Sequence, residues 1–133
     1  MEGQPLFGNN FRVLIDGVEV GISEVSPLTS EGEPGEGGHR TVVLRRALTG
    51  SPELFRWREE AHTGKPATRR VSIHLYDQTG ERPVIAWEFQ GAWPSRYTVP
   101  SLDAKGNDVA MEELELAYER LIWSDHTEEA PAT

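Results

Sequence analysis

Cysteine is absent from this sequence of 133 residues, and so is any long run of apolar residues. Without cysteine, neither a disulfide nor a thiolate metal site can form. No apolar run approaches the roughly 20 residues that a membrane-spanning helix requires, so no membrane span is expected. Residues 1–5 lack the basic start and apolar core of a secretory signal, and we expect synthesis in the cytoplasm.

Positive charge is scarce, because 13 Lys and Arg side chains face 22 Asp and Glu, which gives a net charge of −9. Residues 1–40 carry two basic and seven acidic side chains, residues 41–100 nine and six, and residues 101–133 two and nine. Tight sequence-independent binding of nucleic acid needs clustered Lys and Arg, so stable nucleic-acid binding is not expected. An acidic surface that keeps a monomer soluble explains the charge equally well.

Motifs for catalysis and cofactor binding are also missing. The glycine-rich stretch 35–38 lacks the lysine and hydroxyl residue of a phosphate-binding loop. Glu113 and Glu115 show no burial signal of the kind that perturbs catalytic carboxylates. No metal-ligand spacing relates the four histidines, which are His39, His62, His74 and His126. We therefore predict a protein that is not an enzyme and holds no cofactor or metal.

Alternating apolar and polar residues predict mostly β-strands. The predicted strands cover residues 11–15, 18–25, 41–48, 70–77, 84–90 and 96–102. Gly17 joins the first two strands, and a turn at 78–81 makes a hairpin of the fourth and fifth. Pro100 interrupts the last strand, which suits an edge position or a bend.

One helix is predicted between Pro52 and Gly64. Ser51 can cap the free amides at its start, Pro52 suits the first helical position, and Gly64 suits the end. Leu54 and Trp57 then share one face of the helix.

Residues 109–123 fit two different structures. Their composition favours a helix, with an apolar stripe made by Met111, Leu114, Tyr118 and Leu121. Alternation fits a strand equally, with Glu113, Glu115 and Glu119 on one side and Glu112 as the exception on the other, apolar side. These residues alone leave both structures open.

Two polar segments are predicted to lie outside the core. Residues 28–40 are acidic and glycine-rich, and we expect a mobile loop there. Residues 124–133 are acidic and contain proline, and we expect a disordered tail.

The order of short pieces in the last third of the sequence resembles a known family. Trp87-Glu88-Phe89 is followed by Ala92-Trp93-Pro94, by a turn over 102–110 and by Glu113-Leu114-Glu115-Leu116-Ala117. Upstream pieces that agree with this order are Asn10-Phe11-Arg12-Val13 and Leu44-Arg45-Arg46-Ala47-Leu48-Thr49. The ordered set resembles the tail tube proteins of contractile phage tails and of phage-derived contractile injection systems.

The resemblance implies a mainly β fold over residues 1–123, a small barrel or sandwich of two packed sheets with one flanking helix. It also implies that residues 109–123 form a strand, because β context often overrides helix propensity. Such subunits form stacked hexameric rings, the inner tube that conducts DNA or protein cargo. The partners it implies are further copies of the chain, a sheath protein, baseplate or tube-initiator proteins, and cargo or tape-measure protein, within a virion or an injection-system particle.

The resemblance also suggests candidate site residues. The candidates for contacts between subunits or rings are Arg45, Arg46, Arg69, Arg70, Trp93 and Tyr97. The candidates for the surface that faces the lumen are Glu113, Glu115 and Glu119.

One departure from the family leaves two roles open. Family members commonly carry a longer insertion where this chain has the short segment 28–40, and that insertion bridges to the next ring. A compact tube subunit and a specialised ring between tube and baseplate both fit the shorter segment. The competing hypothesis from another class is a monomeric β-barrel module that binds a sugar or peptide on a platform of Trp93, Tyr97 and Tyr76.

Overall fold

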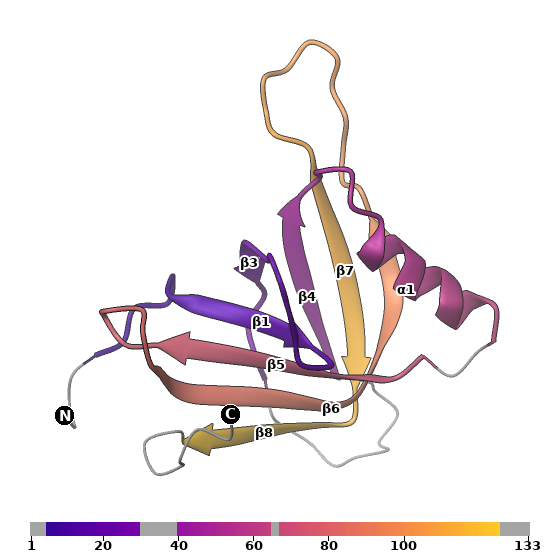
Figure 1. Cartoon of the computed structure of the whole chain (residues 1–133). Helices are drawn as coiled ribbons and strands as arrows, with labels where there is room; N and C mark the ends of the chain where they lie inside the picture. Colours follow the sequence, from indigo (N-terminus) through magenta and orange to yellow (C-terminus); the bar gives the residue numbers. More distant parts are fainter. Residues whose placement is uncertain (1–4, 30–39, 65–66, 126–133) are drawn as a thin grey trace.

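A computed structural model describes residues 5–29, 40–64 and 67–125 (Figure 1). Its strands are β1 (Phe11–Ile15), β2 (Val18–Val20), β3 (Glu24–Val25), β4 (Arg40–Ala47), β5 (Arg69–Tyr76), β6 (Pro83–Thr98), β7 (Met111–Tyr118) and β8 (Arg120–Asp125). One helix, α1 (Glu53–His62), lies between β4 and β5 in the chain. The strand order is β2-β1-β5-β6-β7-β4-β3, with β8 also paired to β6, and every pair is antiparallel. The expectation of a mainly β fold with one helix is confirmed.

The strand β6, 16 residues long, belongs to two sheets. Up to Ala92 it pairs with β5 on one edge, and its residues 85–90 pair with β8 on the other. From Trp93 onward it pairs with β7. Gly91, which lies between the residues that pair with β8 and those that pair with β7, has a φ of +66°, a backbone conformation that residues with a Cβ rarely adopt. We call β2-β1-β5-β6-β8 the first sheet and β6-β7-β4-β3 the second sheet.

Side chains of both sheets and of α1 make one hydrophobic core. Its buried members are Val13, Ile15, Val20, Val42, Leu44, Leu54, Trp57, Val71, Ile73, Phe89, Ala92, Leu114, Leu116 and Tyr118. The end strands β2 and β3 do not pair with each other in the described part of the chain, so the sheet is open and is not closed as a barrel. This arrangement leaves backbone edges that a second chain can reach.

Two predicted strand boundaries are wrong. The predicted strand 18–25 is divided, because β2 pairs with β1 in the first sheet whereas β3 pairs with β4 in the second. Ser23 fixes this change of sheet, since its backbone N–H and its hydroxyl both donate to the Arg45 carbonyl, at 2.9 and 3.0 Å. Alternation of residue types says which side chains share a face, but not which strand lies alongside.

The predicted strands 84–90 and 96–102 are one strand that ends at Thr98. Pro94 lies inside it, where a proline would remove a ladder hydrogen bond from a central strand. This part of β6 pairs with β7 on one edge and with no other described strand. Its other edge therefore has no ladder hydrogen bonds that a missing N–H could break. Pro100 lies beyond the strand, in the loop 99–110.

The ambiguous segment 109–123 is extended, as the resemblance implied. Residues 111–118 form β7 and residues 120–125 form β8, with a break at Glu119. β7 is paired on both of its edges, with β4 on one and with β6 on the other. The backbone hydrogen bonds of these two pairings outweigh the helix propensity of its residues. The predicted tail begins too early, because Ser124 and Asp125 belong to β8.

The predicted helix is present, but its start differs from the prediction. The N-cap position is Pro52, no side chain caps the first turn, and α1 begins at Glu53. Leu54 and Trp57 are buried, and the indole N–H of Trp57 donates to the Ala67 carbonyl at 2.6 Å. The helix ends before Gly64, whose φ is +87°.

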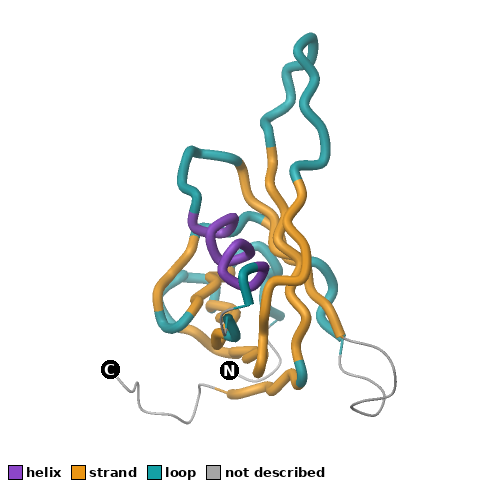
Figure 2. The backbone as a smooth tube through the Cα atoms, turned by 90° about the vertical axis from the view of Figure 1, so that its right-hand side faces the viewer, coloured by secondary structure: helices purple, strands orange, loops and turns teal. Residues whose placement is uncertain are grey.

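The loop 99–110 projects beyond both sheets, as the two views show (Figures 1 and 2). It joins β6 to β7 and stands at the opposite end of the molecule from β8. Residues 30–39 and 126–133, where a mobile loop and most of a disordered tail were expected, lie outside the described residues.

Candidate functional site

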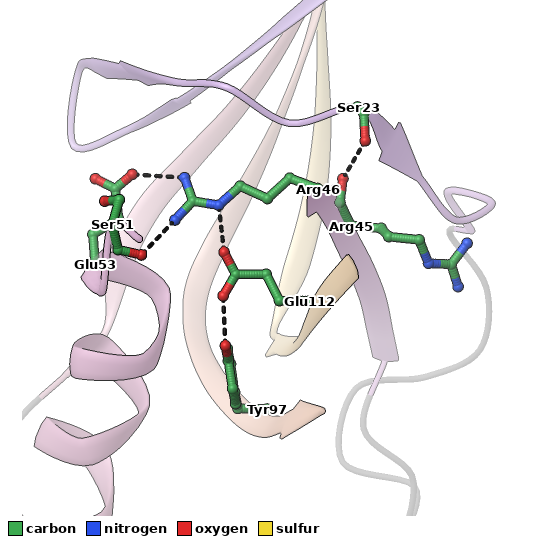
Figure 3. A network of polar contacts seen from close by, with 7 residues as sticks. All are labelled: Ser23, Arg45, Arg46, Ser51, Glu53, Tyr97 and Glu112. Carbon is green, nitrogen blue, oxygen red and sulfur yellow. Dashed lines mark hydrogen bonds and ion pairs between the residues drawn. The ribbon is translucent and has the colours of Figure 1, made fainter. Parts of the chain in front are cut away.

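A buried ion cluster joins α1 to the second sheet (Figure 3). Arg46 and Glu112 lie directly opposite each other on β4 and β7, and they are 7% and 1% exposed. The Arg46 Nε donates to Glu112 Oε2 at 2.6 Å, and its Nη1 donates to Glu53 Oε1 at 2.7 Å. The hydroxyl of Tyr97, on β6, donates to the other Glu112 oxygen at 2.5 Å. Three strands and the helix therefore share one polar contact point.

The charges of this cluster stabilise one another. Burial opposes the charged form of Arg46, but hydrogen bonds to Glu112 and Glu53 more than offset this, and its pKa is raised. Burial, and then the hydrogen bond to Glu112, raise the pKa of Tyr97 to about 12. Tyr97 thus remains a neutral donor to Glu112 throughout the physiological range.

The next pair of residues makes a second ion ladder on the opposite, outward face of the same sheet. Arg45 lies opposite Glu113 on β7 and opposite Glu24 on β3. Its Nη2 is 2.6 Å from Glu113 Oε2, and its Nη1 is 2.9 Å from Glu24 Oε1. Hydrogen bonds to Glu24 and then to Glu113 raise the pKa of Arg45. Solvent reaches all three side chains, so this ladder contributes little to stability by itself.

The outward face of the second sheet also carries Trp93 and Glu115. Trp93 lies opposite Ala117 and is 38% exposed. Glu115 accepts a hydrogen bond from the Ser95 hydroxyl at 2.8 Å, and Arg96 Nε lies 4.0 Å from the same carboxylate oxygen. Glu113 and Glu115 therefore share one face, as alternation predicted.

Glu119 lies at the corner between β7 and β8 rather than on that face. Its N–H donates to the Gln90 carbonyl at 2.9 Å, and its own carbonyl accepts from Arg40 Nη1 at 3.1 Å. A Cβ at Gly91 would come within 2.8 Å of the Glu119 Cδ. A side chain at position 91 would therefore require the Glu119 side chain to move, in addition to the strain of the positive φ.

The remaining arginine candidates lie at the start of β5. Arg69 donates to Glu60 at 3.0 Å and stands 4.8 Å from the centre of the Trp57 ring. The Arg70 side chain is exposed and makes no ion pair with the described part of the chain. Of the four arginine candidates, Arg45, Arg46 and Arg69 thus have partners within their own chain.

The aromatic platform of the competing hypothesis is not assembled. Tyr76 belongs to the first sheet, where Arg12 covers its ring at 4.5 Å. Tyr97 belongs to the second sheet, turns its hydroxyl to buried Glu112, and packs its ring edge-on against Phe55 at 5.3 Å. Trp93 lies on the outward face of that sheet. No group of three or more metal-ligating side chains occurs among the described residues.

Glu112 is the residue that the sequence-based prediction missed. The signal was present, because Glu112 is the charged exception on an otherwise apolar face of β7, and Arg46 follows Val42 and Leu44 on one face of β4, which begins with Arg40. Two such exceptions of opposite charge, on strands that could pair, predict a buried ion pair.

Among the described residues, α1 is too short and too polar to span a membrane.

Comparison with known proteins adds three kinds of finding. Residues 8–122 match the family model of the T4-like virus tail tube protein gp19. A comparison with curated protein sequences gave no match.

Solved structures share the fold. A chain of the sheath–tube complex of the extracellular contractile injection system PVC, in its extended state, is 24% identical with a TM-score of 0.79, covering 93% of this chain and 94% of that one. A chain of the PVC sheath/tube terminator is 23% identical with a TM-score of 0.82, covering 93% and 99%. Hcp1 from Flavobacterium johnsoniae is 16% identical with a TM-score of 0.61, covering 86% and 94%.

Proposed function

The chain belongs to the T4-like virus tail tube protein family, and on this premise we propose that its copies close into hexameric rings that stack into the inner tube of a contractile particle. The observation that supports ring formation is the open sheet. β2 and β3, the two end strands of the sheet, each have one edge without a partner among the described strands. Exposed strand edges invite pairing with another chain, and a ring pairs them while limiting their number.

The proposed role is mechanical and involves no catalytic step. A sheath would drive the tube through a target envelope, and DNA or protein cargo would pass along the lumen. Baseplate or tube-initiator proteins would start the tube, and a tape-measure protein or cargo would occupy it. The chain would be synthesised in the cytoplasm and assembled into a phage tail or an injection-system particle.

The candidate residues divide among three roles on this proposal. Arg70 and Trp93 have exposed side chains and are offered as subunit contacts. Arg46 and Tyr97 instead hold the subunit in shape, because their partners belong to the same chain. Glu113 and Glu115 are offered as lumen-facing groups, where carboxylates would repel a DNA cargo and keep it from adhering.

Negative-stain electron microscopy of the purified chain, with its mass measured by light scattering, tests the ring. Uniform rings with the mass of six copies are expected. Trp93→Asp should reduce ring formation while the circular dichroism of the chain is unchanged, and Glu59→Gln on the exposed side of α1 serves as the matched control. A wild-type chain that stays monomeric at high concentration would contradict the proposal.

The lumen assignment has its own test, which uses the absence of cysteine. Glu115→Cys introduces the single thiol of the chain, and a gold label on it can be located in ring images. Label density inside the ring is expected. Density on the outer rim would show that this face of the second sheet points away from the lumen.

A further inference from the structure

The loop 99–110 carries two large apolar side chains that are strongly exposed. Leu102 is 74% exposed and Val109 is 68% exposed. A single exposed apolar residue needs no explanation, but two on one projecting loop make an apolar surface that solvent disfavours. Neither sheet covers this surface in the described part of the chain, because the loop extends away from both (Figures 1 and 2).

The base of this loop is held more firmly than a solvent-exposed connection requires. The hydrogen bond from Tyr97 to Glu112 joins the two strands directly below the loop, and Arg46 ties Glu112 to β4 and α1. The Leu48 N–H donates to the Ala110 carbonyl at 2.9 Å and fixes one stem of the loop to the chain after β4. A loop anchored on buried polar groups keeps a defined direction relative to the sheets.

The tip of the loop is also internally ordered. The Lys105 N–H donates to Asp103 Oδ1 at 3.0 Å, and the Gly106 N–H donates to the Asp103 carbonyl at 3.0 Å. Such a side-chain and backbone turn reduces the conformational entropy that a binding surface loses on contact. Leu102 lies immediately before this turn, so its position is restricted by it.

The opposite end of the molecule offers a complementary surface. β8 lies there, as an edge strand paired only with β6 among the described strands. Its Trp123 is 61% exposed. Because the loop and β8 lie at opposite ends of the subunit, the loop of one copy can contact β8 of the next copy. The same contact can then repeat along an axis.

We propose that the loop 99–110 is the contact by which one ring stacks on the next, with Leu102 and Val109 packed against the β8 edge around Trp123 of a second copy of this chain. This inference rests on the proposed function, because it requires rings. It assigns the stacking contact to a segment outside 28–40, the short segment where the family commonly carries its bridging insertion.

The test separates stacking from ring formation. Leu102→Ser combined with Val109→Ser should leave ring diameter and ring mass unchanged and shorten the mean length of stacks in electron micrographs at least fivefold. Trp123→Ser should shorten the stacks in the same way. Lys105→Ser combined with Asn107→Ser, in the same loop and equally exposed, is the matched control and should leave stack length unchanged.

Three outcomes would overturn the inference. Wild-type stack length in the Leu102 and Val109 variant would show that the loop is not the stacking contact. Loss of rings in a variant that remains folded by circular dichroism would place the loop between subunits of one ring. Absence of rings from the wild-type chain would instead overturn the proposed function, and the stacking contact with it.

Discussion

Removing the buried carboxylate of Glu112 should strongly destabilise the subunit. In Glu112→Ala, the Arg46 guanidinium loses its buried partner and keeps the Ser51 carbonyl and Glu53, whose side chain is 51% exposed. The Tyr97 hydroxyl loses its acceptor as well. Breaking one partner of a buried ion pair costs about 3–5 kcal/mol, so we expect a decrease of about that size in the free energy of unfolding.

The neighbouring pair on the same two strands provides the control. Glu113→Ala removes the partner of Arg45 on the solvent-exposed face, where an ion pair contributes little to stability, so the free energy of unfolding should change little. Replacing the buried pair together, as Arg46→Met with Glu112→Leu, should recover most of the loss, because apolar residues of similar volume can substitute for a buried pair.

The measurement is equilibrium unfolding in urea, followed by the fluorescence of the chain and by circular dichroism, at a concentration where light scattering shows monomers. Equal losses in Glu112→Ala and Glu113→Ala would refute the reasoning, because burial would then make no difference. A double variant as unstable as Glu112→Ala would refute it too, because the uncompensated charge would not be the cause.

Three further predictions concern stability and pH. The folded state raises the pKa of Tyr97 to about 12 from about 10, so its contribution to the free energy of unfolding is present below pH 10 and is lost as the pH rises toward 12. Urea unfolding across this range should show a steeper loss of stability for the wild type than for Tyr97→Phe. Equal slopes for the two proteins would contradict the assignment. Gly91→Ala should cost at least about 1 kcal/mol because of its positive φ and the close approach of Glu119, whereas Gly21→Ala, with open space around it, should change the unfolding midpoint little. Phe89→Ala should lower the free energy of unfolding by about 3–5 kcal/mol, since the ring is fully buried, and a loss below about 1 kcal/mol in the same urea assay would indicate that the core refills.

Local pattern was sufficient where a segment and its partner are close in sequence. The hairpin of β5 and β6 could be predicted because alternation marks both strands and Gly80, with a φ of +78°, permits the turn between them. The helix could be predicted because Pro52 and Gly64 delimit an apolar face. These features depend on interactions over a few residues, which the sequence displays directly.

Features that depend on distant partners were harder to predict. Gly91 and Pro94 look like strand breaks, yet β6 continues through both, because β8 and β7 pair with its two parts in turn. The buried pair of Arg46 and Glu112 spans 66 positions in the chain, and each residue alone looks like an exposed charge. Charged exceptions on apolar strand faces predict such pairs only when the strands are known to be neighbours.

The order in which the strands occur along the chain has a consequence for biosynthesis. β4 has its long partner in β7, and β6 has partners in β7 and β8, so the second sheet forms, and the first sheet gains β8, only when the last described strands are available. Closing loops of this length before any contact stabilises them makes folding slow compared with hairpin formation. Until residue 118 has left the ribosome, β4 lacks its long partner β7 and the second sheet cannot form. Late completion of the second sheet therefore places the finished subunit after synthesis of the last described strands.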